Sequence, residues 1–339
     1  MKKKLVTVAR TKGLSATMLA SDTNDYRMDT IATVLARSLA GRGGDLTLTL
    51  DPAFQGLPDT AHGGSVLAVF DALAGLPAPR ALGGVYRKRV PLGVPLGLAH
   101  THAGAAHAFT LRDADGAVLV DGRVAPAADG DDGGVRGPHR DPLLLRVVAG
   151  DTLEMSSSGS VASVVEAGPP HPGGVAHPLP VSRACFACGT DNPRGLRVQL
   201  AFDDAAVRGT WQPREPFRAP DGTLTTAALT TLLDEAAFWL GALATGESGM
   251  TTDLAVTLHR PAPFGAPVTV AGARAGVRPR PGDARYWDTE VVAEAGGAPV
   301  ASARITFVAV RGAARRLTTG MLAINDPAVV RRVFPAYAR

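Results

Sequence analysis

The sequence is poor in cysteine, in aromatic residues and in long apolar runs. Its two cysteines exclude a disulfide framework. No apolar run approaches the roughly 20 residues that a bilayer-spanning helix needs. The basic start of the chain resembles a signal peptide, but Arg10 and Lys12 interrupt its apolar run and no small-residue cleavage site follows. We therefore expect a soluble, cytoplasmic protein with no membrane partner.

Clustered charge is also missing. Charged residues make up 19% of the chain, and the net charge is +4. This balance would suit an anionic ligand, but the basic residues are scattered along the chain rather than gathered in one stripe. We therefore expect no nucleic-acid partner. The scarcity of Trp and Tyr, together with abundant Ala, Gly, Pro and Arg, is typical of a GC-rich genome.

Two similar apolar segments organise the chain. In the first, a His-Gly-Gly turn beginning at His62 runs into an apolar helix whose single aspartate, Asp71, lies nine residues after the histidine (71 − 62 = 9). In the second, Asp234 lies nine residues after Thr225 (234 − 225 = 9) in another apolar helix. A Pro-x-Gly-x-Pro bend follows each helix, at 91–95 and 263–267. The repeated order of elements indicates an internal duplication.

The length of 339 residues suits two domains with linkers. Each half combines one helix with several antiparallel strands, which predicts the α+β class. Alternating residues over 46–50 predict a half-buried strand, and Gly75 is expected to end the first helix. The predicted order is an N-terminal extension over 1–42 with a helix at 29–40, a domain over 43–126, a Gly- and Pro-rich linker over 127–181, a domain over 182–311 and a surface tail over 312–339.

The first repeat resembles the PaaI-like branch of the hotdog-fold thioesterases, in which a His-Gly-Gly turn precedes an aspartate by nine residues. The second half adds a Cys-x-x-Cys-Gly sequence followed by Asn-Pro-x-Gly-Leu, over 185–196, which resembles the entry sequence of such domains. The resemblance covers roughly 43–126 and 183–310. It implies two fused hotdog domains, each a long central helix wrapped by a curved antiparallel sheet, as in double-hotdog proteins.

The resemblance also implies an activity. The expected reaction is hydrolysis of an acyl-CoA thioester to a free acid and coenzyme A. Coenzyme A would be part of the substrate, and no separate cofactor is expected. An acyl-carrier thioester is an alternative substrate, and two double-hotdog chains are expected to pair as a homodimer.

Helix geometry shows that the predicted site must be composite. Nine residues of helix rise about 13 Å, so Asp71 cannot reach a carbonyl held by the amides of Gly63 and Gly64 on its own helix. Those first-turn amides can polarise a thioester oxygen. In a pair of pseudo-symmetric halves, Asp234 would face them and act as a general base or as a nucleophile. His62 would position this helix start.

The mirror-related site is expected to be impaired or silent, because Asp71 would face threonines instead of glycines. By resemblance, Thr251 supplies a hydroxyl to the Asp234 side. Gln55 is expected to help to hold the thioester oxygen or the water. Basic residues are expected to contact the phosphates of coenzyme A, namely Arg89, Arg260 and Arg278.

Two alternative functions stay open at this stage. A non-hydrolytic acyl-CoA or acyl-carrier binding protein would share the same fold. A hotdog dehydratase or hydratase is disfavoured, because the catalytic His-Phe-Pro-Gly of the dehydratases is missing. Cys185 and Cys188 have the spacing of zinc ligands, but no second Cys-x-x-Cys is available, so we expect no metal.

Overall fold

The computed structural model describes residues 29–42, 45–127 and 175–338. Most of the predicted extension and most of the predicted linker lie outside these ranges. The helices are α1 (Ile31–Arg37), α2 (Gly63–Ala74), α4 (Thr226–Thr245), α5 (Ala314–Leu322) and α6 (Pro327–Val333). Short 3-10 turns are η1 (Pro52–Phe54), η3 (Glu215–Phe217) and η4 (Arg274–Gly276).

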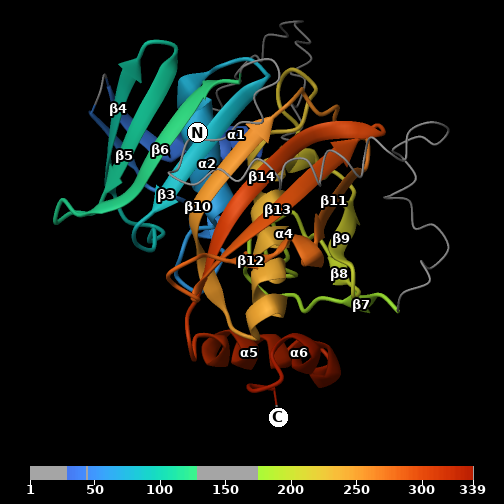
Figure 1. Cartoon of the computed structure of the whole chain (residues 1–339). Helices are drawn as coiled ribbons and strands as arrows, with labels where there is room; N and C mark the ends of the chain where they lie inside the picture. Colours follow the sequence, from blue (N-terminus) through green and yellow to red (C-terminus); the bar gives the residue numbers. More distant parts are fainter. Residues whose placement is uncertain (1–28, 43–44, 128–174, 339) are drawn as a thin grey trace, which may run out of the picture.

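One antiparallel sheet runs through both halves of the molecule (Figure 1). The first unit holds β1 (Leu39–Arg42), β2 (Asp45–Leu48), β3 (Arg80–Tyr86), β4 (Leu96–Ala103), β5 (Ala106–Arg112) and β6 (Val118–Pro126). The second unit holds β7 (His177–Pro178), β8 (Ala201–Phe202), β9 (Ala206–Trp211), β10 (Gly249–Leu258), β11 (Val268–Ala273), β12 (Arg278–Pro279), β13 (Tyr286–Ala295) and β14 (Ala298–Ala309).

The two units repeat one topology. In the first, the strands lie in the order β2-β4-β5-β6-β3, and in the second the matching strands, read toward the junction, lie in the order β9-β11-β13-β14-β10. β3 and β10 pair antiparallel at the junction, with Gly83 opposite Ala255. This pairing makes the sheet continuous across the units. The predicted architecture of two fused hotdog domains is therefore confirmed.

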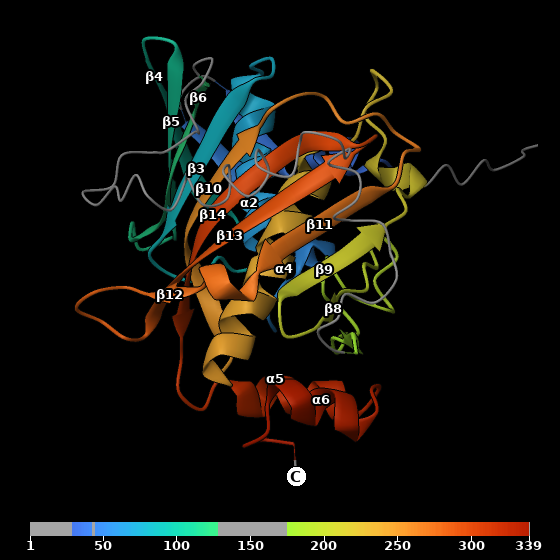
Figure 2. The same ribbon diagram turned by 45° about the vertical axis from the view of Figure 1, so that its right-hand side comes forward.

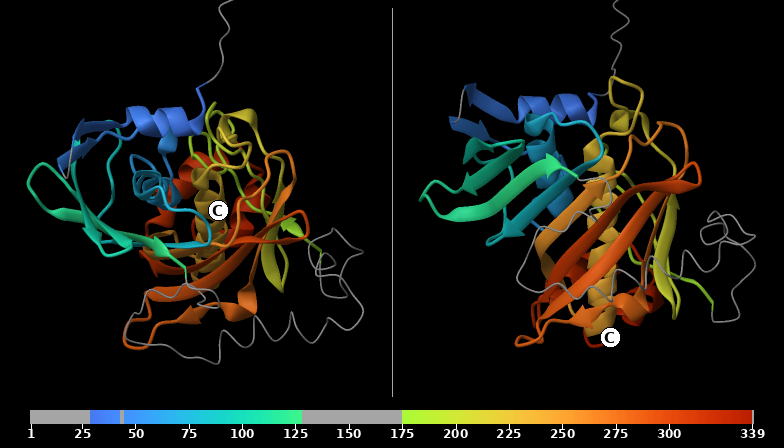
Figure 3. Two further views of the ribbon diagram at one scale, coloured as in Figure 1. Left: turned by 90° about the horizontal axis from the view of Figure 1, so that it is seen from above. Right: turned by 45° about the horizontal axis from the view of Figure 1, so that its top comes forward.

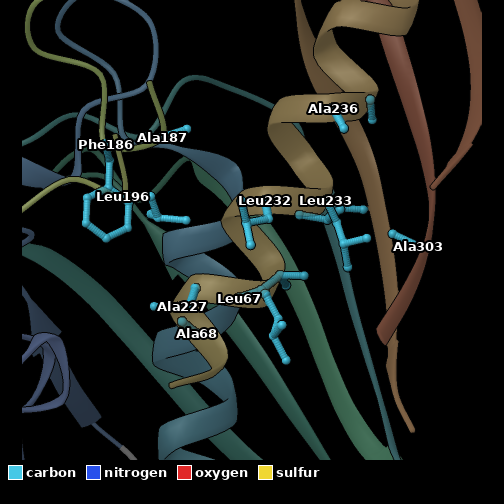
Figure 4. Packing of buried hydrophobic residues seen from close by; sticks show 14 of the residues in the cluster. Leu67, Ala68, Phe186, Ala187, Leu196, Ala227, Leu232, Leu233, Ala236 and Ala303 are labelled. Carbon is cyan, nitrogen blue, oxygen red and sulfur yellow. The ribbon is translucent and has the colours of Figure 1, made fainter. Parts of the chain in front are cut away.

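The sheet curves around the two central helices, α2 and α4 (Figures 2 and 3). The helices cross closely because Gly64 lacks a side chain: a Cβ there would lie 2.6 Å from the backbone of Thr230. The Thr230 hydroxyl also donates to the Gly64 carbonyl at 2.7 Å. Leu67 and Ala68 of α2 and Ala227 of α4 pack at this crossing (Figure 4). Their burial stabilises the contact that brings each helix start to the middle of the other helix.

Several predicted boundaries shift by a few residues. The helix expected over 29–40 is shorter, because Leu39 and Ala40 pair with β2 as part of β1. Thr30 caps its start and Ser38 its end. The strand expected over 46–50 is β2, which ends at Leu48. Gly75 ends α2 in the left-handed conformation, with φ 63°, as predicted.

The segment after residue 311 is not a surface tail. It folds into α5 and α6 and covers the C-terminal end of α4 (Figure 1). Phe334 is fully buried, and its ring centroid lies 6.2 Å from that of Trp239 on α4. Met321 of α5 is also buried. The apolar side chains of this segment therefore extend the core of the second unit.

α4 is long and apolar enough, in length and composition, to cross a membrane. The sequence interpretation had found no run of that length. In the structure, 83% of the most apolar 18-residue stretch of this helix is buried inside the protein. The helix is hydrophobic all round because it is the central helix of the second unit.

Candidate functional site

A cavity between the two units gathers five of the ten predicted site residues, namely His62, Gly63, Asp234, Thr251 and Arg89. Its volume is about 100 Å³. The first unit supplies the loop before α2 and the residues that follow β3, whereas the second supplies α4, the start of β10 and the loop around Cys185. Leu317 and Met321 of α5 close one side. A smaller cavity of about 40 Å³ shares Arg89, Met250 and Leu317 and therefore adjoins the first.

Asp234 is held by both units. Its Oδ1 accepts a hydrogen bond of 2.6 Å from the Thr251 hydroxyl, and its Oδ2 accepts one of 3.1 Å from the Gly64 amide at the start of α2. Burial by itself raises the pKa of Asp234, but the nearby His62, Thr251 and Gly64 lower it more, so the pKa falls below its usual value. Asp234 is therefore an ionised carboxylate in a buried site.

His62 lies between two acidic residues. Its Nδ1 lies 3.0 Å from Asp234 Oδ2 without a well-aligned hydrogen bond, and its Nε2 lies 3.6 Å from Glu235 Oε2. Burial lowers the pKa of the imidazole, but Asp234 and Glu235 raise it more, to well above the ordinary 6.5. His62 is also the N-cap residue of α2, where its side chain makes no capping hydrogen bond. Its contacts point to the second unit instead.

The two glycines of the predicted turn serve different neighbours. A Cβ on Gly63 would lie 2.8 Å from Asp234 Oδ2, so its lack of a side chain admits the carboxylate. Gly64 lies against the backbone of α4, where a side chain would clash with Thr230, as described above. The sequence interpretation assigned both glycines to a close approach by substrate. In the structure both face the second unit, and the Gly64 amide is occupied by Asp234.

Glu235 follows Asp234 on α4 and faces the loop that carries the cysteines. Its Oε1 accepts a hydrogen bond of 2.9 Å from the Trp239 indole, and its Oε2 lies 4.0 Å from Cys185 Sγ. Interaction with Cys185, burial and the charge of Glu235 raise the pKa of Cys188 well above its usual value. The helical spacing of Glu235 and Trp239, four residues apart, is the one signal for this pair that the sequence contained.

The predicted entry sequence over 185–196 attaches the second unit to the first. The Phe186 amide donates to the Gln55 carbonyl at 2.5 Å, and the Phe186 ring packs against Phe54 with centroids 4.9 Å apart. The Asn192 side chain donates to the Ala53 carbonyl at 2.7 Å. This segment therefore holds Cys185 and its neighbours against the loop that precedes α2.

Asp71, the mirror-related aspartate, is fully engaged elsewhere. The Arg80 guanidinium donates to both of its carboxylate oxygens, from Nε at 2.5 Å and from a terminal nitrogen at 2.7 Å. The Thr226 hydroxyl donates to it at 2.5 Å. Asp71 thus faces the start of α4, as the pseudo-symmetric argument predicts, but it is held in a part-buried ion pair and does not line the cavity that holds Asp234.

Three of the predicted binding residues lie away from the cavity. The Gln55 side chain accepts from the Asp59 amide at 3.4 Å and does not line it. Arg260 donates to three backbone carbonyls, one of them Pro299 at 3.2 Å. Arg278 donates to the carbonyls of η4 and its neighbour. These contacts stabilise loops, so the expected roles of these three residues have no geometric support.

Arg89 is the predicted phosphate contact that does line the cavity, where Lys88 accompanies it. Tyr86 was missed by the sequence interpretation. Its hydroxyl donates to the Gly63 carbonyl at 2.6 Å, and burial, with the charge of Asp234, raises its pKa well above 10. No local pattern marks it, because its contact with Gly63 depends on the packing of β3 against α2.

No family model and no curated protein matches the sequence of this chain. Similar solved structures exist. A chain described provisionally as a thioesterase II, from Thermobifida fusca YX, gives a TM-score of 0.51 at 14% identity and covers 82% of this chain and 97% of its own. A TesB protein from Mycobacterium avium subspecies paratuberculosis gives 0.48 at 13%, covering 81% and 98%. The dehydratase domain of RzxB from Pseudomonas fluorescens gives 0.44 at 14%, covering 78% and 93%. The chain is thus a two-unit hotdog protein with a buried carboxylate at the junction of its halves.

Proposed function

We propose that this protein is a thioester hydrolase that acts on acyl-CoA or a related acyl thioester at one composite site. The observation that carries this proposal is the placement of Asp234. Its carboxylate lies at the start of α2 from the other unit, beside the Thr251 hydroxyl and inside a cavity. The resemblance to PaaI-like enzymes and the thioesterase names of similar structures are consistent with it.

The chemistry assigns a role to each group. The amide of Gly63 is one of the first-turn amides without an intrahelical partner and would polarise the thioester oxygen. Asp234 would then take a proton from an attacking water, or attack the carbonyl carbon itself. In the second route the carbon–sulfur bond breaks, coenzyme A leaves as a thiol after protonation, and water cleaves the mixed anhydride. Both routes yield the free acid.

The surroundings of the cavity suit an acyl thioester. Val90, Phe238 and Met250 give it an apolar lining that would accept an acyl chain. Arg89 and Lys88 carry positive charge at the same cavity and would attract the phosphates of coenzyme A. The adjoining smaller cavity shares Arg89 and would extend this binding region.

The decisive experiment compares two matched carboxylates. Release of free thiol from a panel of acyl-CoA substrates is measured for the wild type, for Asp234→Asn and for Asp71→Asn. We expect Asp234→Asn to lose about 100-fold or more of the activity, and Asp71→Asn to keep most of it. Equal losses would contradict the single composite site. In a single turnover in ¹⁸O-water, label on Asp234 identifies the anhydride route, with water attacking the Asp234 carboxyl carbon.

A lyase is the second candidate, and the 3.0 Å approach of His62 Nδ1 to Asp234 favours it. A histidine and a carboxylate from opposite units could remove water from a 3-hydroxyacyl thioester, one acting as base and the other as acid. The same substrate panel tests this reading through the ultraviolet absorbance of the enoyl product. Tight binding with neither reaction would instead indicate an acyl-thioester binding protein.

A further inference from the structure

Three metal-ligating side chains converge at the edge of the cavity, and a fourth, Cys188, lines the same cavity. Cys185, Cys188 and Glu235 come from the second unit and His62 from the first, and all four are buried. Ligand atoms of His62, Cys185 and Glu235 lie within 4.8 Å of one another. The proposed hydrolysis uses neither cysteine. The sequence argument against zinc rests on the lack of a second Cys-x-x-Cys, whereas folding brings a histidine and a glutamate to Cys185.

The loop that carries the cysteines is shaped as a tight turn around sulfur. The Ala187 amide donates to Cys185 Sγ at 3.3 Å, and the Gly189 amide donates to the Cys185 carbonyl at 2.9 Å. A Cβ on Gly189 would lie 2.2 Å from that carbonyl oxygen, so the turn needs glycine there. An amide hydrogen bond to sulfur favours the thiolate form that binds metals. Two cysteines at this spacing are a usual half of a zinc site.

The remaining two ligands lie at suitable separations. In a tetrahedral zinc site with ordinary bond lengths, a nitrogen and an oxygen ligand are about 3.4 Å apart, and a sulfur and an oxygen ligand about 3.6 Å apart. The observed separations are 3.6 Å between His62 Nε2 and Glu235 Oε2, and 4.0 Å between Cys185 Sγ and Glu235 Oε2. Small side-chain rotations would close these three ligands around one ion, and the Cys188 thiol, which lines the same cavity, would turn in as the fourth.

Neighbouring groups orient both the carboxylate ligand, Glu235, and the imidazole ligand, His62. Trp239 donates to Glu235 Oε1 at 2.9 Å and leaves Oε2 directed at Cys185. Asp234 lies 3.0 Å from His62 Nδ1, the ring nitrogen that would carry the proton when Nε2 binds a metal. A carboxylate behind a ligating histidine is the usual support of such a ligand.

Charge balance also favours a cation. Asp234 and Glu235 are adjacent buried carboxylates, and His62 is the ion-pair partner that the described residues offer them. Arg89 and Lys88 line the cavity, but Arg89 contacts the sulfur of Met250 and Lys88 lies 3.7 Å from Asp113. A divalent ion would offset the excess negative charge that these carboxylates and two thiolates would create.

We propose that Cys185, Cys188, His62 Nε2 and Glu235 bind one zinc ion. Two thiolates, one imidazole and one carboxylate in a tetrahedral arrangement suit Zn²⁺. Because the ligands come from both units, the ion ties the loop before α2 to the second unit and fixes the ring of His62. The four protein ligands make this a closed site that holds structure rather than activates water. This inference stands apart from the proposed hydrolysis.

A second histidine cluster must be separated from this site. His100, His102 and His107 lie on β4 and β5, and His100 Nε2 is 3.0 Å from His107 Nδ1. This cluster is partly exposed and contains no thiol. The cluster provides a matched control, because a metal bound there would have histidine nitrogens and no thiolate among the ligands that the cluster supplies.

The test uses the full chain without an affinity tag. Zinc content is measured by mass spectrometry after growth with added zinc, and Co²⁺ is then exchanged into the protein. We expect one zinc per chain and, with Co²⁺, both the visible bands of a tetrahedral ion and a thiolate-to-cobalt charge-transfer band. That band reports on Cys185 and Cys188, which are the two cysteines of the chain.

The variants decide between the sites. Cys185→Ser and Cys188→Ser should lose the ion and the charge-transfer band, whereas His102→Ala should keep both. Asp234→Asn retains all four ligands and should bind zinc about 10–100-fold more weakly. If a cysteine variant fails to fold, titration of the wild type with a mercurial reagent replaces it, and zinc should be released as both thiols react. No zinc in the wild type, or cobalt bound without the thiolate band, overturns the proposal.

Discussion

Arg80 holds Asp71 through two hydrogen bonds, of 2.5 and 2.7 Å, on the side of the molecule where the repeat predicts a second site. On the other side Thr251 gives Asp234 a single hydrogen bond of 2.6 Å. Both donors come from the strand at the junction of the units, β3 or β10. The two aspartates at matching positions therefore have different surroundings, because Asp71 is paired with a guanidinium and Asp234 with a hydroxyl.

The Arg80 ion pair predicts a structural role for Asp71. Asp71→Asn would leave the Arg80 guanidinium, 17% exposed, without its charged partner. We expect unfolding to become easier by about 2–3 kcal/mol, because hydrogen bonds to charged groups are lost in a mostly buried place. Urea denaturation measures this. Asp121→Asn, which breaks an exposed pair with Arg87, is the control and should change stability by less than about 1 kcal/mol.

The Thr251 hydroxyl predicts a loss of activity without a comparable loss of stability. Thr251→Val removes the donor to Asp234 Oδ1 and keeps the shape of the side chain. We expect the rate of thiol release to fall about 10–100-fold, which corresponds to losing one hydrogen bond to a carboxylate. Thr251→Ser restores the hydroxyl and should recover most of the rate. A serine variant as slow as the valine variant would show that the hydroxyl is not the reason.

The two glycines of α2 predict opposite outcomes. Gly63→Ala places a Cβ 2.8 Å from Asp234 Oδ2, so the carboxylate must move and thiol release should fall sharply while the protein stays folded. Gly64→Ala places a Cβ 2.6 Å from the backbone of Thr230, which cannot move without separating the helices. Its melting temperature should fall, with a cost of about 1–3 kcal/mol or more. Thermal melts and activity assays are made on both variants. A loss of stability in Gly63→Ala, or an unchanged melting temperature in Gly64→Ala, would contradict the assignment.

The packed C-terminal segment predicts that Phe334 stabilises the second unit. Phe334→Ala removes a fully buried ring that packs near Trp239, which in turn holds Glu235. We expect a destabilisation of about 3–5 kcal/mol in urea. Arg332→Ala changes an exposed residue of α6, the helix that ends just before Phe334, and should be nearly neutral. A neutral effect of Phe334→Ala would mean that the segment is a surface tail after all.

The sequence by itself determined the repeated architecture and the elements that carry the site. The apolar helices with one aspartate each, the turns at Gly75 and the bends after each helix are local signals, and local signals depend on backbone conformation and on periodicity. The rise of a helix was enough to predict that Asp234 and the His62 turn meet from opposite halves.

Tertiary structure decided what surrounds each of these groups. Arg80 and Tyr86 of β3 reach Asp71 and Gly63 of α2 because the strand folds back against that helix. The Thr226 hydroxyl reaches Asp71 from the other unit. The placement of His62 and Glu235 beside Cys185 depends on the same docking of units. Contacts between side chains of different elements leave no periodic trace in one chain, so only the folded arrangement could identify them.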